Sequence, residues 1–395
     1  MESDDYLLDG RAIAALFTER FGYSPALCCF APGRVNLIGE HTDYNGGRVF
    51  PCAIHLGIAA AAAKRPDGKW RFYSRNFPDD GIVIGSVDAL EGDGRWTDYP
   101  KGVIRTFRAF GYPLSQGADI VFAGNLPDGA GLSSSAALEV LTGTLLRELY
   151  DIPVTPQQIA VFGQFAENRF IGVNCGIMDQ FASAMGRRNH ALLLDTNTLE
   201  VDYAPIDGNQ AVLVIVNSGV KHSLASSAYN DRRRECEKAL GCLNENGKTK
   251  FPALCALPPE EFERRKGAIP DEICRRRAKH AVYENARTFA AAQALRDSDL
   301  PKFGALMKES HLSLRDDYEV SCEELDFLAE TAWATEGVYG ARMTGGGFGG
   351  CTVNLVRPEA VTDFIAHVTA AYEAQFGIQA ESYVVTPSDG ACRLS

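Results

Sequence analysis

The stretch GNLPDGAGLSSSAALEV, from Gly124 to Val140, carries the strongest structural signal in the sequence. After its serines, leucines recur at helical spacing, which predicts a helix that begins near residue 134 or 135; they are Leu138, Leu141, Leu145 and Leu149. Glycines let the backbone approach a phosphate closely, and a helix N-terminus adds positive partial charge. The stretch therefore predicts a phosphate-binding loop that lacks the lysine of a Walker motif. A glycine turn followed by an ordinary serine N-cap is the alternative.

Strand-like and helix-like patterns alternate along the rest of the chain, which favours a mixed fold of the α+β or α/β kind. Thr155 and Pro156 predict the start of a second helix, whose apolar face is followed by Glu167. Short apolar runs at 192–194, 212–216 and 351–356 predict buried strands, and the last is followed by a predicted helix (359–375) and strand (382–385). Pro205 interrupts the pattern, so we expect two domains, 1–204 and 205–395.

Length and composition restrict the class of protein. A chain of 395 residues with 46% apolar content suggests two domains of roughly equal size. A net charge of −12 argues against nucleic acid or an anionic membrane as the main partner. The eleven cysteines show no CxxC spacing and are expected to be reduced thiols, and we find neither a signal peptide nor a membrane span. These features predict a cytoplasmic protein.

A second glycine-rich segment, TGGGFGG, spans Thr344 to Gly350. It formally contains GxGxxG, but it precedes a predicted strand instead of following one, so it does not fit a dinucleotide fingerprint. We expect a glycine loop that packs against the phosphate loop or a bound substrate. A tight turn between a helix and a strand is the alternative.

Charged residues gather in two further segments. GRVNLIGEHTDYNGG, from Gly33 to Gly47, holds carboxylates, a histidine and an amide among four glycines, a mixture that suits the directed hydrogen bonds of a polyol. A solvated loop is the alternative. NCGIMDQFASAMG, 174–186, places Asp179 in an apolar stretch, where a carboxylate is paired, functional or a helix cap.

Together these motifs resemble the galactokinase family. GRVNLIGEHTDYNGG is similar to its sugar signature, GLSSSAA to the phosphate loop of the GHMP kinase superfamily, and TGGGFGGC to the third motif of that superfamily. CGIMDQFAS and the stretch NSGVKHSLASSAYNDRRREC (217–236) also resemble galactokinases, so the similarity covers nearly the whole chain. It implies a two-domain GHMP kinase fold with an N-terminal domain resembling a ribosomal small-subunit protein domain. The C-terminal α/β domain would enclose the active site with it.

The resemblance also implies roles for individual residues. Asp179 would lie beside the reactive hydroxyl as general base, and Arg34 would assist it. The residues expected around galactose are Arg34, Glu40, His41, Asp43, Gly176, Asp179 and Tyr229. Those expected to wrap the triphosphate are Gly129, Ala130, Gly131, Leu132, Ser133, Ser134 and Ser135, with Trp96 near the adenine. Ser135 and Glu167 would hold Mg²⁺.

The implied reaction is phosphorylation of the anomeric hydroxyl of α-D-galactose by ATP, the first committed step of galactose catabolism. Galactose and ATP would be the partners, with no obligate protein partner. The alternatives are a kinase for N-acetylgalactosamine, galacturonate or arabinose, and a sugar sensor without catalysis. The HTDYNGG form favours galactose, and the complete serine loop at 134–137 favours an enzyme.

Overall fold

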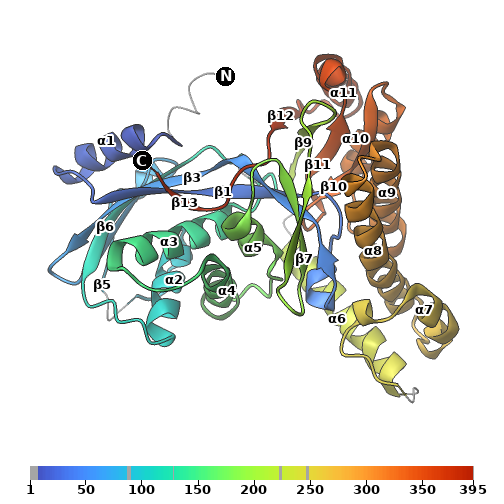
Figure 1. Cartoon of the computed structure of the whole chain (residues 1–395), viewed down its shortest axis with the longest axis horizontal. Coiled ribbons are helices and arrows are strands. Elements are labelled where there is room, and N and C mark those ends of the chain that lie inside the picture. Colours follow the sequence, from blue (N-terminus) through green and yellow to red (C-terminus); the bar gives the residue numbers. More distant parts are fainter. Residues whose placement is uncertain (1–7, 87–89, 128, 222–224, 246–248, 395) are drawn as a thin grey trace.

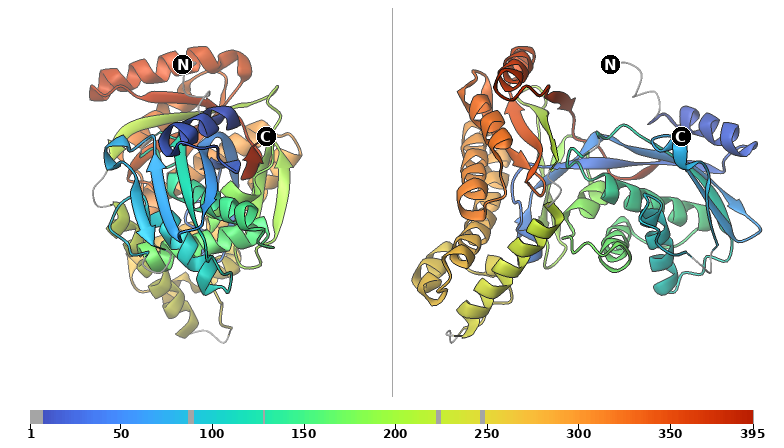
Figure 2. Two further views of the ribbon diagram at one scale, coloured as in Figure 1. Left: turned by 90° about the vertical axis from the view of Figure 1, so that its left-hand side faces the viewer. Right: turned by 180° about the vertical axis from the view of Figure 1, so that it is seen from behind.

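The computed structural model describes residues 8–86, 90–127, 129–221, 225–245 and 249–394. It contains a first lobe built on a six-stranded sheet and a second lobe built on a four-stranded sheet with long helices (Figure 1). Strand β7 (His190–Asp195) of the third, three-stranded sheet lies where the two lobes meet (Figure 1), and Figure 2 shows the lobes from the side and from behind. No helix among these residues is long and apolar enough to cross a membrane.

The first lobe packs helices on both faces of its sheet. Its strand order is β13-β1-β3-β6-β4-β5, from Cys392–Leu394, Leu27–Asn36, Pro51–Arg65, Gly117–Gly124, Lys69–Ser74 and Val83–Ser86. Helix α1 (Gly10–Phe21) covers one face (Figure 1). The other face carries α2 (Asp98–Ala109), α3 (Ser134–Tyr150), α4 (Pro156–Ala166) and α5 (Met178–Met185). A run of alanines in β3, Ala59–Ala63, is buried and allows helices to approach the sheet closely.

Both predicted helix starts in this lobe are confirmed. Helix α3 begins at Ser134, and α4 begins after Thr155, which forms a capping box with Gln158. The small sheet consists of β2 (Arg48–Val49), β7 (His190–Asp195) and β8 (Val201–Pro205), so the strand predicted at 192–194 is confirmed as well. The division into 1–204 and 205–395 falls at the end of β8 and stays a prediction.

The second lobe is an antiparallel sheet in the order β10-β11-β9-β12, from Val338–Thr344, Gly349–Val356, Val212–Lys221 and Glu381–Val385. Its helices are α6 (Ala225–Glu245), α7 (Pro259–Arg265), α8 (Glu272–Arg296), α9 (Leu300–Ser313), α10 (Glu323–Ala334) and α11 (Val361–Phe376). The strands predicted at 212–216, 351–356 and 382–385 and the helix at 359–375 are confirmed. A short π-helix, η7 (Leu314–Tyr318), follows α9.

The end of the chain returns from the second lobe to the first. After β12, the backbone amide of Ser388 donates to the carbonyl of Ala53. Strand β13 then pairs antiparallel with β1, with Cys28 opposite Leu394. The last strand of the sequence therefore completes the first sheet and holds the two lobes together.

Candidate active site

A cavity of about 430 Å³ lies where the two lobes meet. It is lined by the end of β1, the loop that follows β1, the segment before α5, the first turns of α6 and the glycine loop after β10. The seven residues expected around the sugar all line it: Arg34, Glu40, His41, Asp43, Gly176, Asp179 and Tyr229. They come from both halves of the sequence, so the fold brings together residues as distant as 34 and 229.

Asp179 occupies the first turn of α5, as its segment predicts. The guanidinium group of Arg34 donates to both carboxylate oxygens, with Nε–Oδ1 and Nη2–Oδ2 distances of 2.8 Å and 2.9 Å. The hydroxyl of Ser133 donates to Oδ2 at 2.5 Å. Because Arg34 is only 4% exposed, this bidentate pair is fixed at the wall of the cavity. The remaining amine of Arg34, Nη1, donates to the carbonyl of Gly131 at 2.6 Å.

The phosphate loop leads into α3 without a serine cap. Gly129, Gly131 and Ser133 have left-handed backbones with φ of 67°, 70° and 62°. Ser133 occupies the N-cap position but its side chain makes no cap hydrogen bond, so the amides at the helix start remain open to an anion. The ordinary serine N-cap that we kept as an alternative is therefore wrong.

The glycine loop between β10 and β11 packs on this phosphate loop, as expected. A Cβ added to Gly345 would lie 3.3 Å from the carbonyl oxygen of Gly131. From the other side β1 also comes close, because a Cβ added to Gly33 would lie 2.7 Å from the carbonyl oxygen of Leu132. The backbone of the phosphate loop is thus held between two glycine contacts.

A second cavity, of about 180 Å³, adjoins the start of α3. Its lining includes Trp96, Phe77 and Tyr99 together with Ser134 and Ser135. The rings of Trp96 and Phe77 are stacked with an interplanar angle of 11°, and the indole N–H of Trp96 donates to Asp80 at 2.9 Å. An apolar, aromatic cavity that ends at two serine hydroxyls suits a planar base attached to phosphates.

Two buried carboxylates lie behind the phosphate loop. The side-chain amide of Gln180 donates to Glu139 and to Glu167 at 2.9 Å and 2.8 Å. The Ser135 hydroxyl is close enough to Glu167 to lower its pKa in part, against the larger effect of burial. Burial raises the pKa of both carboxyls, and the charge of Glu167 raises that of Glu139 further. The second oxygen of Glu139 has no partner among the described residues.

These residues fit a divalent cation, although no cluster of three or more His, Cys, Asp or Glu in metal-binding geometry occurs in the described part of the chain. Mg²⁺ prefers oxygen ligands and keeps several of its own waters and phosphate contacts, so it needs few from the protein. A cation at Ser135 and Glu167 would also relieve the repulsion between the two buried carboxylates. Sequence reasoning missed Glu139 and Gln180, although Glu139 stands between Leu138 and Val140 and Gln180 stands beside Asp179. The cost of a polar group in such an apolar stretch is the signal that could have found them.

Asp43 and Gly176 meet at the wall of the cavity. A Cβ added to Gly176 would lie 1.5 Å from Oδ2 of Asp43, so only glycine leaves room for this carboxylate. Burial and the neighbouring Asp179 raise the pKa of Asp43 to about 6. The hydroxyl of Thr196, which directly follows β7 of the small sheet, donates to the backbone carbonyl of Asp43 at 3.0 Å. This bond fixes the turn that holds Asp43.

Glu40 connects the loop after β1 to the glycine loop. One of its oxygens accepts from the amide of Gly345 at 2.8 Å and from Arg342 at 3.3 Å. Both Glu40 and Arg342 are buried, so this ion pair is shielded from water. Its position agrees with a role in orienting the loop. The pairing of Arg342 with Glu40 could not be predicted from the sequence, because the two residues lie about three hundred positions apart.

His41 lies among aromatic rings with a left-handed backbone, φ 61°. Its Nδ1 is 2.8 Å from the hydroxyl of Tyr44, which is 2.8 Å from the hydroxyl of Tyr318. The ring centroids of His41 and Tyr229 are 5.5 Å apart. Burial is the main cause that lowers the pKa of His41 to about 3, so the ring is neutral and suited to binding.

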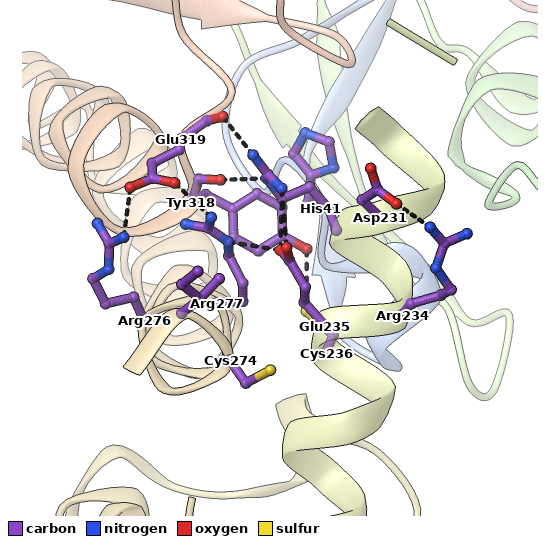
Figure 3. A network of polar contacts seen from close by, with 12 residues as sticks. His41, Asp231, Arg234, Glu235, Cys236, Cys274, Arg276, Arg277, Tyr318 and Glu319 are labelled. Atoms are coloured by element: carbon purple, nitrogen blue, oxygen red, sulfur yellow. Dashed lines mark hydrogen bonds and ion pairs between the residues drawn. The ribbon is translucent and has the colours of Figure 1, made fainter. Parts of the chain in front are cut away.

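An ion network fixes α6, which carries Tyr229, against α8 and η7 (Figure 3). The guanidinium group of Arg277 on α8 donates to Glu235 on α6 at 2.9 Å and to Glu319 after η7 at 2.6 Å. Arg232 donates to the carbonyl of Tyr318 at 2.7 Å. Arg277 is 1% exposed, so the network anchors the helix that brings Tyr229 to the cavity.

The sequence matches three descriptions of known families. The galactokinase galactose-binding signature matches residues 15–64, the N-terminal domain of GHMP kinases matches 98–187, and the C-terminal domain of GHMP kinases matches 291–374. Among similar proteins are galactokinases of Clostridium beijerinckii, 50% identical with coverage of 96% of this chain and 97% of that one, and of Bacillus subtilis, 49% identical with coverage of 97% and 98%.

Solved structures give the same result. The crystal structure of a Lactococcus lactis galactokinase complexed with galactose is similar with a TM-score of 0.94 and 42% identity, covering 97% of this chain and 99% of that chain. A mevalonate kinase of Methanococcus jannaschii shares the fold, with a TM-score of 0.63, 17% identity, and coverage of 92% and 98%.

Proposed function

This chain belongs to the galactokinase family of GHMP kinases, and from this we infer that it transfers the γ-phosphoryl group of ATP to the anomeric hydroxyl of galactose. The observation that carries the proposal is the cavity between the lobes, where the Arg34–Asp179 pair faces the start of the phosphate loop. The product would be galactose 1-phosphate, from the α anomer.

Phosphoryl transfer depends mainly on alignment and on stabilising charge. Asp179 would hold the anomeric hydroxyl and accept its proton as the bond to phosphorus forms. Arg34 holds this carboxylate in a fixed orientation through its ion pair. Through Nη1 it also reaches the carbonyl of Gly131, so one side chain aligns the base with the phosphate loop.

ATP would bind with its adenine in the cavity at Trp96 and its phosphates on residues Gly129 to Ser135. The open amides at the start of α3 would bind phosphate oxygens. Ser135 and Glu167 would hold Mg²⁺, which when bound neutralises charge on the transferring phosphoryl group. Glu139 and Gln180 would keep Glu167 in place.

On the sugar side, Asp43, His41, Glu40 and Tyr229 would contact galactose. Because Gly176 lets the Asp43 carboxylate reach into the cavity, a hydroxyl of the wrong configuration would leave a buried carboxylate without a partner. We therefore propose galactose as the preferred sugar over glucose and over N-acetylgalactosamine, galacturonate and arabinose. The intact loop from Ser133 to Ala137 supports catalysis over a sensor role.

We propose that the enzyme works in the cytoplasm with small-molecule partners alone, without nucleic acid, membrane or an obligate protein partner. All eleven cysteines are free thiols, which suits a reducing compartment. Seven of them are buried, so exposure to an oxidant is limited to the others.

The test is ADP release by the purified protein with ATP, Mg²⁺ and a panel of hexoses. We expect turnover with galactose and little with glucose. Equal turnover on glucose, or a preference for N-acetylgalactosamine, would contradict the sugar assignment. Binding of galactose and ATP without turnover would instead establish the sensor role.

A further inference from the structure

Two peptide groups of the loop after β1 are held by side chains of a helix in the other lobe. The amide of Gly39 donates to Oε1 of Glu284 at 3.0 Å, and the carbonyl of Glu40 is 3.1 Å from Nε2 of His280. Both side chains belong to α8 and both are completely buried. Glu40 and the adjacent His41 line the cavity, so these bonds lie directly behind the sugar site.

The two side chains belong to one stripe of α8. His280, Glu284 and Thr288 are four residues apart, so they share a face of the helix, and all three are 0% exposed. The loop packs tightly on this stripe, because a Cβ added to Gly39 would lie 2.9 Å from Oγ1 of Thr288. Thr288 donates to its own helix and makes no bond to the loop.

Each holding group is itself fixed by neighbours. Ser310 donates to the oxygen of Glu284 that binds Gly39, at 2.5 Å, and Arg287 donates to the other oxygen at 2.8 Å. Nδ1 of His280 is 2.9 Å from the hydroxyl of Ser313. Glu284 is therefore an oriented acceptor, and little freedom remains for either side chain.

The protonation of His280 follows from its partners. A carbonyl oxygen can only accept, so Nε2 donates its proton to the Glu40 carbonyl. Nδ1 lies 2.9 Å from the hydroxyl oxygen of Ser313, which also lies 3.2 Å from Oδ2 of Asp317. Burial is the main cause that lowers the pKa of this imidazole to about 4, which keeps the ring neutral at physiological pH. His280 is thus a neutral donor aimed at the Glu40 carbonyl.

We propose that His280 and Glu284 are positioning residues for the sugar: they hold the backbone at Gly39 and Glu40 so that Glu40 and His41 face galactose. The inference rests on the proposed function. His41 has a left-handed backbone, which is unfavourable for a residue with a side chain, so the loop needs outside contacts to keep this shape. The bonds from α8 supply such contacts, and they come from a helix that carries none of the cavity residues.

The test compares two substitutions of His280, of which only one can still donate a hydrogen bond to the Glu40 carbonyl. His280→Leu removes the donor to Glu40, whereas His280→Gln offers an amide N–H in its place, and both lose the bond to Ser313. We expect KM for galactose to rise about tenfold or more in His280→Leu and to stay within about threefold of the parent in His280→Gln. KM for ATP should change less than about threefold in both. Thr106→Val is the control and should leave both constants unchanged, because this buried threonine belongs to α2 in the first lobe and its hydroxyl donates to Gly102 of its own helix.

A second readout does not depend on activity. Hydrogen exchange followed by mass spectrometry should show faster exchange of the peptide that contains Gly39 to His41 in His280→Leu than in His280→Gln. Ser310→Ala provides a milder variant should His280→Leu fail to fold, because it loosens Glu284 and should also raise exchange at Gly39.

Equal exchange and equal KM for galactose in the leucine and glutamine variants would overturn the inference, as would a parallel rise in KM for ATP. A parent protein that does not turn over galactose would refute the proposed function alone, since the exchange experiment still tests whether α8 holds the loop.

Discussion

At the scale of single residues, Asp179 offers the sharpest test of the chemistry. Asp179→Asn keeps the shape and can still accept one bond from Arg34, but it removes the charge that accepts the proton. We expect turnover to fall by a factor on the order of a hundred or more, with galactose affinity within about tenfold of the parent. Single-turnover kinetics and calorimetric binding would measure the two effects. A variant that folds normally and turns over within a few-fold of the parent would exclude general-base catalysis by this residue.

Gly176 provides a steric test of the sugar site. In Gly176→Ala the new methyl group would occupy the position of the Asp43 carboxylate, 1.5 Å from Oδ2, so that carboxylate must move. We expect KM for galactose to rise by at least about tenfold while the thermal midpoint changes little, because the strain is relieved into the cavity.

Gly241→Ala is the matched control for this change. Gly241 lies in α6, nothing lies within 4 Å of its added Cβ, and alanine is the better helix former. Its kinetic constants should equal those of the parent. If Gly176→Ala also leaves KM for galactose unchanged, Asp43 does not determine sugar affinity.

At the scale of elements, the proposed metal site depends on three helical segments. Glu139 belongs to α3, Glu167 to the π-helix η4 (Glu167–Ile171) and Gln180 to α5. Glu167→Gln removes the charge at their meeting point, so we expect severe loss of activity and a higher Mg²⁺ requirement. Galactose binding without nucleotide, measured by calorimetry, should survive. An unchanged Mg²⁺ dependence would mean that Glu167 only stabilises the contact between these segments.

The elements also show what the sequence could and could not predict. The starts of α3 and α4 were predictable because their signals are local: apolar spacing after Ser134, and Thr155 before a proline. Asp179 stood out because a carboxylate in an apolar segment is costly. His280 and Glu284 gave no such signal, since they lie in a polar helix and their partners are more than two hundred residues away. Their role depends on how α8 packs on the loop, which tertiary contacts determine.

At the scale of the whole molecule, the buried histidines make stability depend on pH. The pKa of His280 is lowered to about 4, below the value of about 6.5 in an unfolded chain. At pH values between these two, the unfolded state therefore binds more protons than the folded state. Stability is therefore lost as pH falls from about 6.5 toward 4. His41 acts in the same direction, whereas Asp43, with its raised pKa, acts in the opposite one.

A comparison with His280→Gln isolates one of these groups. Between pH 8 and pH 5 the parent should lose about 2 kcal/mol more unfolding free energy than the variant, from the pKa difference at this site. Urea unfolding at a series of pH values gives the difference directly. Parallel curves for the two proteins would show that His280 has no depressed pKa in the folded state.

The returning strand β13 has a consequence for how the protein is made. Strand β13 follows the second lobe in the sequence, so during synthesis the edge of β1 beside Cys28 stays unpaired until residues 392–394 have been made. An open sheet edge can pair with the edge of another chain. Nascent chains are thus most vulnerable to aggregation before β13 has been made, and the pairing of β13 with β1 then covers this edge.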